Sequence, residues 1–258
     1  MLFLLSPAKS LDYESPAQVD THTQPLFIRQ SAALIDVLKT RSSQDISDLM
    51  KLSDALADLN VARYRAWSRK FSVKNSKQAI LAFNGDVYDG LNAKTLSAAQ
   101  LDWAQDHVCI LSGLYGVLRP LDLMQPYRLE MGTQLHTASG KNLYQFWHTQ
   151  LSQYLNERAV ATSSPVVVNL ASEEYFKAVD LAALKARVVQ CVFEDYKNGA
   201  FKIISFHAKR ARGLMVRYAI ENKITAVKKL ERFGAEGYQF AAPESTPDRL
   251  VFRRRIDA

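Results

Sequence analysis

The fold is decided by the stretch SAAQLDWAQDHVCILSGLYG, residues 97–116, in which a helix pattern is followed at once by a strand pattern. Ser97 has the side chain of a helix N-cap, and Leu101 and Ala104 lie one turn apart on the helix that follows. Residues 108–112 then form a short apolar run of the kind found in buried strands. A helix, a strand and a glycine-containing turn in direct succession are typical of α/β proteins.

The same alternation continues on both sides of this stretch. We expect strands at residues 2–5, 79–83, 166–170, 188–193, 201–206, 237–240 and 250–254, and helices at residues 26–39, 44–52, 59–69, 143–157, from 172 and 207–222. No linker, repeat or low-complexity tract divides the chain. We therefore predict a single domain, residues 1–258, of mixed α/β type with a central mixed sheet covered by helices.

The composition is typical of a globular protein, with 48% apolar and 23% charged residues in a chain of 258. The apolar run at residues 1–5 is cut off by Ser6 and Pro7, which makes it too short for a signal peptide or a membrane span. Cys109 and Cys191 lie in apolar, strand-like runs, so we expect two buried thiols without a disulfide. These features predict a cytoplasmic protein with no membrane partner.

The positive charge is concentrated at one end of the chain. Residues 197–258 hold fourteen Lys and Arg against six Asp and Glu, whereas residues 1–196 hold nineteen against twenty. No acidic residue occurs between Tyr196 and Ile220, and that interval contains Lys197, Lys202, Lys209, Arg210, Arg212 and Arg217. Such a one-sided field attracts polyanions, so it predicts a partner and not a fold.

The helix expected at residues 207–222 has one apolar side for the core. On a helical wheel Arg210 and Arg217 lie opposite that side, with Lys209 and Arg212 on its flank. A solvated charged face is the usual explanation of such a pattern, but no carboxylate is interleaved with these residues before Glu221. We therefore predict that the four basic side chains bind an anion.

Residues 44–69 have the outline of a helix-hairpin-helix, which presents backbone N–H groups to a DNA phosphate. Residues 58–60, Asp-Leu-Asn, stand where that motif has glycines, and Asp and Asn tolerate the left-handed conformation. The alternative is an amphipathic helix pair packed on the sheet. If the hairpin forms, Lys51 before it and Arg63 and Arg65 after it are candidate DNA contacts.

Several expected strands end in a short polar motif, and in open α/β sheets the carboxyl ends of strands line the ligand crevice. Arg119 and Arg128 suit a phosphate, Tyr115 suits stacking on a base, and His207 suits a general base. Turns, helix caps and structural hydrogen bonds are the alternative role for each. The candidate pocket residues are Ser6, Lys9, Asn84, Asp86, Tyr115, Arg119, Arg128, Asn169, Glu174 and His207.

No complete catalytic, cofactor or metal motif occurs in the sequence. It has no Gly-x-Ser-x-Gly, no phosphate-binding loop and no Cys-x-x-Cys or His-Glu-x-x-His. The histidines at positions 22, 107, 136, 148 and 207 show no metal-ligand spacing. We expect no cofactor and no metal, and the sequence leaves enzymatic activity open while favouring a binding protein.

Five segments of the chain resemble the YaaA family of peroxide stress resistance proteins. They are residues 4–13, 82–88, 111–132, 169–176 and 201–214, and the run from Ser112 to Met131 is the most specific. The resemblance implies a cytoplasmic protein that is induced by hydrogen peroxide and protects DNA, with limitation of free intracellular iron as the route. It also implies an unusual α/β fold that binds double-stranded DNA through a basic cleft and a helix-hairpin-helix.

Two functions follow from these observations. The first is a double-stranded DNA-binding protein whose contacts are mostly to phosphate. The second is an enzyme that acts on a nucleotide, a nucleobase or a nucleic acid in a cleft formed by the strand-end motifs, with a nucleotide-like small molecule as ligand. Direct iron binding has no support beyond the resemblance, and no pattern specifies an oligomeric state.

Overall fold

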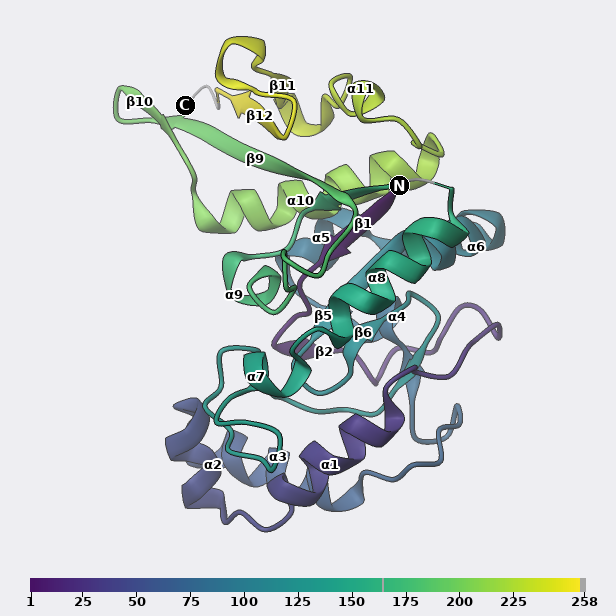
Figure 1. The fold of residues 1–258 in the computed structure, drawn as a ribbon, viewed down its shortest axis with the longest axis vertical. Helices are drawn as coiled ribbons and strands as arrows, with labels where there is room; N and C mark the ends of the chain where they lie inside the picture. The colour runs from purple at the N-terminus through teal and green to yellow at the C-terminus, as the bar shows by residue number, and fades with distance from the viewer. Residues whose placement is uncertain (164, 256–258) are drawn as a thin grey trace.

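A computed structural model of the protein describes residues 1–163 and 165–255, and a mixed sheet runs through it (Figure 1). The strand order is β11-β12-β9-β8-β1-β5-β6, and β10 pairs with β9. The strands are β1 (Leu2–Leu5), β5 (Val108–Ser112), β6 (Gly116–Leu118), β8 (Val166–Asn169), β9 (Arg187–Lys197), β10 (Ala200–Lys202), β11 (Gln239–Phe240) and β12 (Arg249–Arg254). The predicted fold class, mixed α/β with a central mixed sheet, is confirmed.

The centre of the sheet is parallel. β1 lies between β5 and β8, and Leu4 pairs with Cys109 on one side and Asn169 on the other. β9 continues the parallel part beside β8, and β12 continues it beside β9. Parallel strands covered on both faces consist of nearly continuous apolar residues, which explains why their sequences made them predictable.

Two small ladders lie outside this sheet, β2 (Ser10–Leu11) with β4 (Phe83–Asn84) and β3 (Lys77–Gln78) with β7 (Leu123–Met124). The strand expected at residues 79–83 is wrong, because residues 79–82 form the short helix α4 (Ala79–Ala82) before β4 begins. All four side chains of α4 are buried. An apolar run of this length has no periodicity to separate a buried strand from a buried helical turn.

The remaining helices are amphipathic or short. They are α1 (Ile28–Leu38), α2 (Ser43–Met50), α3 (Asp54–Ala66), α5 (Asp86–Leu91), α6 (Ala98–His107), α7 (Leu143–Trp147), α8 (Gln150–Ala161), α9 (Glu173–Phe176), α10 (Ser205–Glu221) and α11 (Val227–Leu230), with 3-10 turns at Ala93–Thr95, Ala235–Gly237 and Ala242–Glu244. Ser97 caps α6 as expected, since its side chain accepts the Gln100 N–H in a capping box. The strand expected at residues 201–206 is only partly present, because β10 ends at Lys202 and α10 begins at Ser205.

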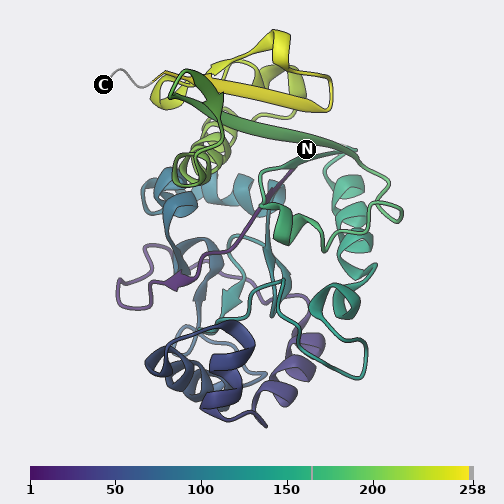
Figure 2. The same cartoon turned by 90° about the vertical axis from the view of Figure 1, so that its left-hand side faces the viewer.

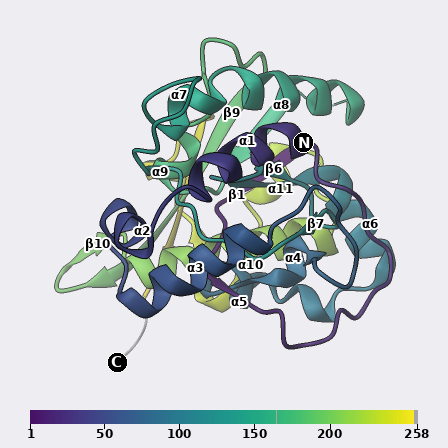
Figure 3. The same ribbon diagram turned by 90° about the horizontal axis from the view of Figure 1, so that it is seen from below.

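The helices are divided between the two faces of the sheet. Figure 2 shows α5 and α10 on one side of β1 and α8 on the other. α1, α2 and α3 form the lower end of the molecule in Figure 1, and they lie nearest the viewer in Figure 3. None of the helices in the described part of the chain has the length and apolarity that crossing a bilayer requires.

The core is continuous and rich in aromatic side chains. Phe3, Tyr64, Tyr115 and Trp147 are among the largest side chains that are completely buried. The two cysteines are buried and unpaired as predicted, and burial raises the pKa of both thiols to about 12. At neutral pH they are therefore inert thiols and not redox groups.

Candidate functional site

A cleft lies where the carboxyl ends of β1 and β8 meet the start of α5 and the first half of α10. It encloses about 400 Å³, and small-molecule sites span roughly 300–1,000 Å³. Its walls are formed by residues 6–10 and 84–87 together with Glu130, Ser172, Glu174, Tyr175, Lys209 and Arg212. Polar side chains of both charges therefore converge from segments far apart in the sequence.

Ser6 and Ser172 join the ends of the two central strands. The Ser6 hydroxyl oxygen accepts the Ser172 backbone N–H at 2.8 Å and donates its proton to the Ser172 hydroxyl at 3.2 Å. The Tyr88 hydroxyl of α5 donates to the Ser6 carbonyl at 3.0 Å. These bonds hold β1, β8 and α5 in fixed positions around the cleft.

The segment Asn84-Gly85-Asp86 supplies a second wall. Asn84 pairs with Ser10 in the β2–β4 ladder, which keeps the two segments side by side. Gly85 has φ of +145°, a conformation that favours glycine. α5 begins directly afterwards, and the Asp86 carboxylate in its first turn lies where the helix dipole favours a negative charge.

The third wall depends on a close crossing of α5 and α10. A Cβ atom added to Gly213 would lie 1.8 Å from the Val87 carbonyl oxygen, and one added to Gly90 would lie 2.2 Å from the Arg210 carbonyl oxygen. Because glycine has no Cβ, Gly90 and Gly213 let the backbones of the two helices approach this closely. The crossing places the Lys209 Nζ 3.9 Å from the Asp86 Oδ2.

Arg212 is the least compensated charge on the cleft. Its side chain lines the cavity, and burial lowers the pKa of its guanidinium. Among the residues that the structure describes it has no ion-pair partner within 4.0 Å and no hydrogen bond. Arg212 is only half-buried, so its guanidinium keeps some contact with water, and an anion that enters the cavity would supply the counter-charge that it lacks.

The carboxylates of the cleft differ in how far they are already engaged. Glu130 lies 3.0 Å from the Lys9 Nζ and 3.0 Å from the Arg128 Nη2. Glu174 accepts the Gly132 backbone N–H at 2.9 Å with one of its oxygens. Asp86 has only its long contact with Lys209, so Asp86 and the second oxygen of Glu174 remain available as acceptors.

Half of the predicted pocket residues lie on this cleft, namely Ser6, Lys9, Asn84, Asp86 and Glu174. Tyr115 does not, because it is completely buried with its hydroxyl bonded to the Trp67 Nε1 at 3.0 Å. Asn169 is also buried, and its side chain accepts the Ala171 backbone N–H at 3.0 Å. The Tyr115 hydroxyl also bonds to the Gln125 backbone, so it ties the turn between β5 and β6 to distant segments, whereas Asn169 supports the turn that follows β8.

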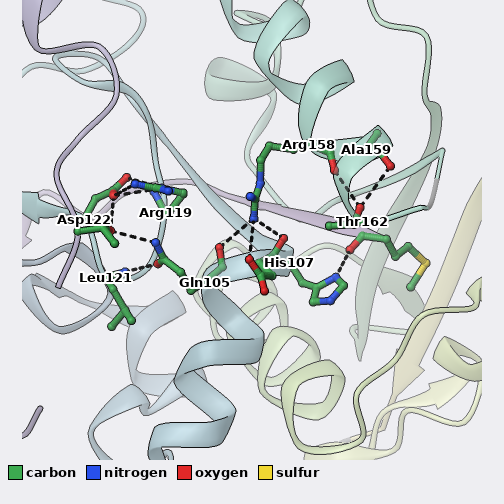
Figure 4. Close-up of polar contacts among 11 residues, drawn as sticks. Gln105, His107, Arg119, Leu121, Asp122, Arg158, Ala159 and Thr162 are labelled. Carbon is green, nitrogen blue, oxygen red and sulfur yellow. Dashed lines mark hydrogen bonds and ion pairs between the residues drawn. The ribbon is translucent and has the colours of Figure 1, made fainter. Parts of the chain in front are cut away.

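Arg119 takes part in a structural network with Asp122 (Figure 4). It is not among the residues that line the cleft. Its Nη2 lies 2.7 Å from the Oδ1 of Asp122, whose side chain is fully buried. Arg128 contacts the cleft only through Glu130. His207 lies 3.4 Å from the buried Asp195, beside β9 and away from the cleft.

The basic residues of α10 have different surroundings. Arg210 pairs with Glu236 at 2.6 Å, and the hydrogen bonds to that carboxylate raise the pKa of its guanidinium. Arg217 pairs with Glu221 at 2.8 Å and donates to the Leu91 and Asn92 carbonyls at the end of α5. The partner of Arg210 is distant in sequence, so the wheel pattern did not reveal that this charge is compensated.

The helix pair at residues 44–69 forms, but its turn is not where the hairpin motif would place it. α2 ends at Met50, Lys51 adopts the left-handed conformation, and α3 begins at Asp54. Residues 58–60 are helical, in the interior of α3. A helix-hairpin-helix is therefore not confirmed, and α2 and α3 pack on each other, with α3 also on α1.

The three basic residues of this pair lie outside the cleft. Lys51 and Arg65 are exposed. Arg63 is half-buried, lines a separate cavity with Tyr13, and has its pKa lowered by burial. Figure 2 shows this pair below, and α10 above, the segment around β2.

Sequence reasoning missed several cleft residues. Ser172, Glu130 and Tyr175 line the cavity but were not among the predicted pocket residues. Lys209 and Arg212 were predicted as DNA contacts and not as pocket residues, and both line the cavity. Ser172 had a usable signal, since it ends the polar motif after β8. Lys209 had one as well, since residues 207–209 form a polar motif after an expected strand, but the position of Arg212 depends on how α10 crosses α5.

Comparison with known proteins gives a full-length match. A family model described as peroxide stress protein YaaA matches residues 1–244, which include every residue of the cleft. A UPF0246 protein of Polaromonas sp. (strain JS666) is 73% identical over 255 residues, 99% of this chain and 99% of that protein. A UPF0246 protein of Bordetella petrii is 69% identical over 255 residues, 99% of this chain and 100% of that protein.

Proposed function

This chain belongs to the YaaA family of peroxide stress proteins, and we propose that it binds double-stranded DNA in the cytoplasm through phosphate contacts around the cleft. The observation that carries the proposal is Arg212, a partly desolvated guanidinium without an anionic partner in the described part of the chain. Lys209, one turn earlier on α10, is half-exposed and only weakly paired with Asp86. The two side chains offer adjacent positive charge to a phosphate group.

The remaining basic residues contribute unequally to this surface. Lys51 and Arg65 are exposed and would extend it toward α2 and α3. Arg210 and Arg217 are held by carboxylates, so a phosphate must compete with an existing ion pair at each. Contacts of this kind carry no sequence information, so binding is expected on any duplex and is expected to weaken with salt.

The test compares two double variants of α10 that remove the same formal charge. Lys209→Ala with Arg212→Ala is expected to weaken binding to a labelled random-sequence duplex about tenfold or more at low salt. Arg210→Ala with Arg217→Ala is the matched control and is expected to have a smaller effect. Equal affinities of the wild type and the Lys209/Arg212 variant in fluorescence anisotropy would refute the assignment.

Binding to DNA gives a direct route to protection, because the bound protein covers part of the duplex. Limitation of free iron stays a prediction of family membership. Within residues 1–163 and 165–255, no group of three or more His, Cys, Asp and Glu side chains is placed to hold a metal ion. We propose that the protective role operates through the bound nucleic acid.

The cleft also favours a second function, an enzyme that acts on a nucleotide, a nucleobase or a nucleic acid. The supporting observation is a 400 Å³ cavity that combines available carboxylates with an uncompensated Arg212. Incubation with nucleotides and with DNA, followed by chromatography of the products, tests it. Release of a base, phosphate or altered nucleotide that is lost in Asp86→Asn would support the enzyme, and no product from any substrate would argue against it.

A further inference from the structure

We propose that Phe206, at the start of α10, stacks on an unpaired base of DNA while Lys209 holds a phosphate of the same strand. The inference deepens the proposed DNA-binding function and rests on it, because it names the form of DNA that this surface fits best. That form is a duplex interrupted by unpaired bases, such as a single-stranded gap.

Phe206 is the one aromatic side chain that is exposed in the described part of the chain. It is 57% exposed, whereas all other Phe, Tyr and Trp side chains there are buried or half-buried. α10 begins at Ser205, at the base of the β9–β10 hairpin, which projects from the molecule in Figures 1 and 3. Isolated exposed aliphatic side chains are normal, but aromatic rings are enriched where a surface binds a partner.

The two other aromatic rings of this hairpin are already covered. Tyr196 on β9 and Phe201 on β10 lie edge to face, with ring centroids 5.2 Å apart. The Arg255 guanidinium lies 3.8 Å from the centroid of the Tyr196 ring and 5.3 Å from that of the Phe201 ring. Among the described residues, Phe206 has an aromatic contact only with the adjacent His207 ring, at 5.7 Å between centroids. Its ring therefore remains available to a planar partner.

The surroundings of Phe206 are positively charged. Lys209 follows it by three residues, so the two side chains are neighbours on one face of α10. Lys202 is exposed at the end of β10, and residues 197–219 include no acidic residue. The nearest carboxylate to Lys209 is that of Asp86, at 3.9 Å. The exposed ring therefore lies beside a cation that the proposed function assigns to a phosphate, and this pairing fits a polyanion that carries planar groups.

A base can stack on Phe206 only where it is not enclosed in a duplex. Within an intact duplex both faces of a base are covered by its neighbours, whereas a gap exposes them. Aromatic side chains bind such bases without sequence preference, since every base has a π-face. An anionic membrane fits less well, because α10 buries its apolar side in the core and does not offer the broad apolar face by which helices bind membranes.

The experiment is fluorescence anisotropy with three labelled duplexes of equal length. One is intact, one contains a short single-stranded gap, and one contains the same gap with abasic nucleotides, which keep the phosphates but have no base. The wild type is expected to bind the gapped duplex most tightly. Phe206→Ala should weaken binding of that duplex about 5- to 150-fold, the range for losing one base–aromatic stack, and should leave the other two unchanged.

Three variants serve as controls. Phe206→Trp keeps an aromatic face and should bind the gapped duplex at least as tightly as the wild type. Leu181→Ala removes an apolar side chain of similar exposure, 59%, between α9 and β9, and should change none of the affinities. Lys209→Ala removes a phosphate contact and should weaken binding of all three duplexes.

The outcomes separate this inference from the proposed function. Equal wild-type affinity for the gapped duplex and either other duplex, or an equal loss on all three in Phe206→Ala, would overturn the inference and leave the proposed function standing. Binding of the gapped duplex without the intact one would keep the inference and remove double-stranded DNA binding. Absence of binding to all three would remove both. If Phe206→Ala lost only binding to anionic phospholipid vesicles, the surface would belong to a membrane and the inference would be wrong.

Discussion

Gly213→Ala tests the helix crossing on which the cleft depends. The Cβ of an alanine would lie 1.8 Å from the Val87 carbonyl oxygen and 2.8 Å from the Leu91 backbone nitrogen. Real Cβ contacts are essentially never shorter than 3.0 Å, so the two helices must separate by about 1.2 Å at this point. The obstacle is backbone on a facing helix, which cannot rotate away as a side chain can.

The expected cost combines two opposing effects. Overpacking in a well-packed interior costs typically about 1–3 kcal/mol. Alanine gains up to about 1 kcal/mol over glycine within a helix. Because the clash here is severe and involves backbone, we expect the upper end of the first range and a net loss of about 2 kcal/mol in the free energy of unfolding.

The assay is urea unfolding followed by circular dichroism, with Gly234→Ala as the matched control. A Cβ at Gly234 would meet only the Tyr238 carbonyl oxygen, at 3.7 Å, so that variant should change stability by less than about 0.5 kcal/mol. The separation also moves Lys209 and Arg212 away from Asp86, so ligand affinity should fall with stability. If Gly213→Ala were as stable as the control, the close crossing of α5 and α10 would be refuted.

Two further substitutions test residues outside the cleft. Arg119→Ala should cost about 3 kcal/mol, because it removes the guanidinium that pairs with the buried Asp122 carboxylate and leaves the Thr23 hydroxyl and the residue-119 N–H as its donors. Ligand binding by the folded variant should stay unchanged. Urea unfolding measures the first effect and calorimetry the second, and a loss of binding would place Arg119 in the site. Asp12→Asn should destabilise the protein at pH 7, because the hydrogen bond from Lys94 lowers the pKa of the Asp12 carboxyl below its ordinary 3.8. A lowered pKa stabilises the fold above pH 3.8 and loses that contribution as the pH falls further, so the gap between the wild type and Asp12→Asn should close below that pH in unfolding experiments. A gap that is independent of pH would contradict this cause.

The sheet was predictable because its central strands are buried on both faces. Such strands leave continuous apolar runs, as at residues 2–5 and 108–112, and the Ser97 cap marks the helix that directly precedes β5. Residues 79–82 are also a continuous apolar run, but they form a helical turn. A run of four residues is too short for its periodicity to distinguish a helix from a strand. Strand order depends on pairings between distant segments, which no local pattern encodes.

The candidate site was predictable in part from polar residues at or just beyond the ends of strands. Ser6 directly follows β1 and Asp86 lies two residues after β4, and both line the cleft. Arg119 follows a strand too, but Asp122 three residues later binds it, and that spacing was a readable warning. Glu236 binds Arg210 from twenty-six residues away, so which cations of α10 remain available is a property of the tertiary structure.

The central claim is that this YaaA family member binds DNA through phosphate contacts, and a salt titration of the wild-type protein with a labelled random-sequence duplex tests it most directly. The claim predicts binding at low salt that weakens linearly on a log–log plot, with a slope near −0.9 for each phosphate neutralised. Two to four contacts from Lys209, Arg212, Lys51 and Arg65 would give a slope of roughly −2 to −4. No binding at low salt, or an affinity that does not change with salt, would contradict it.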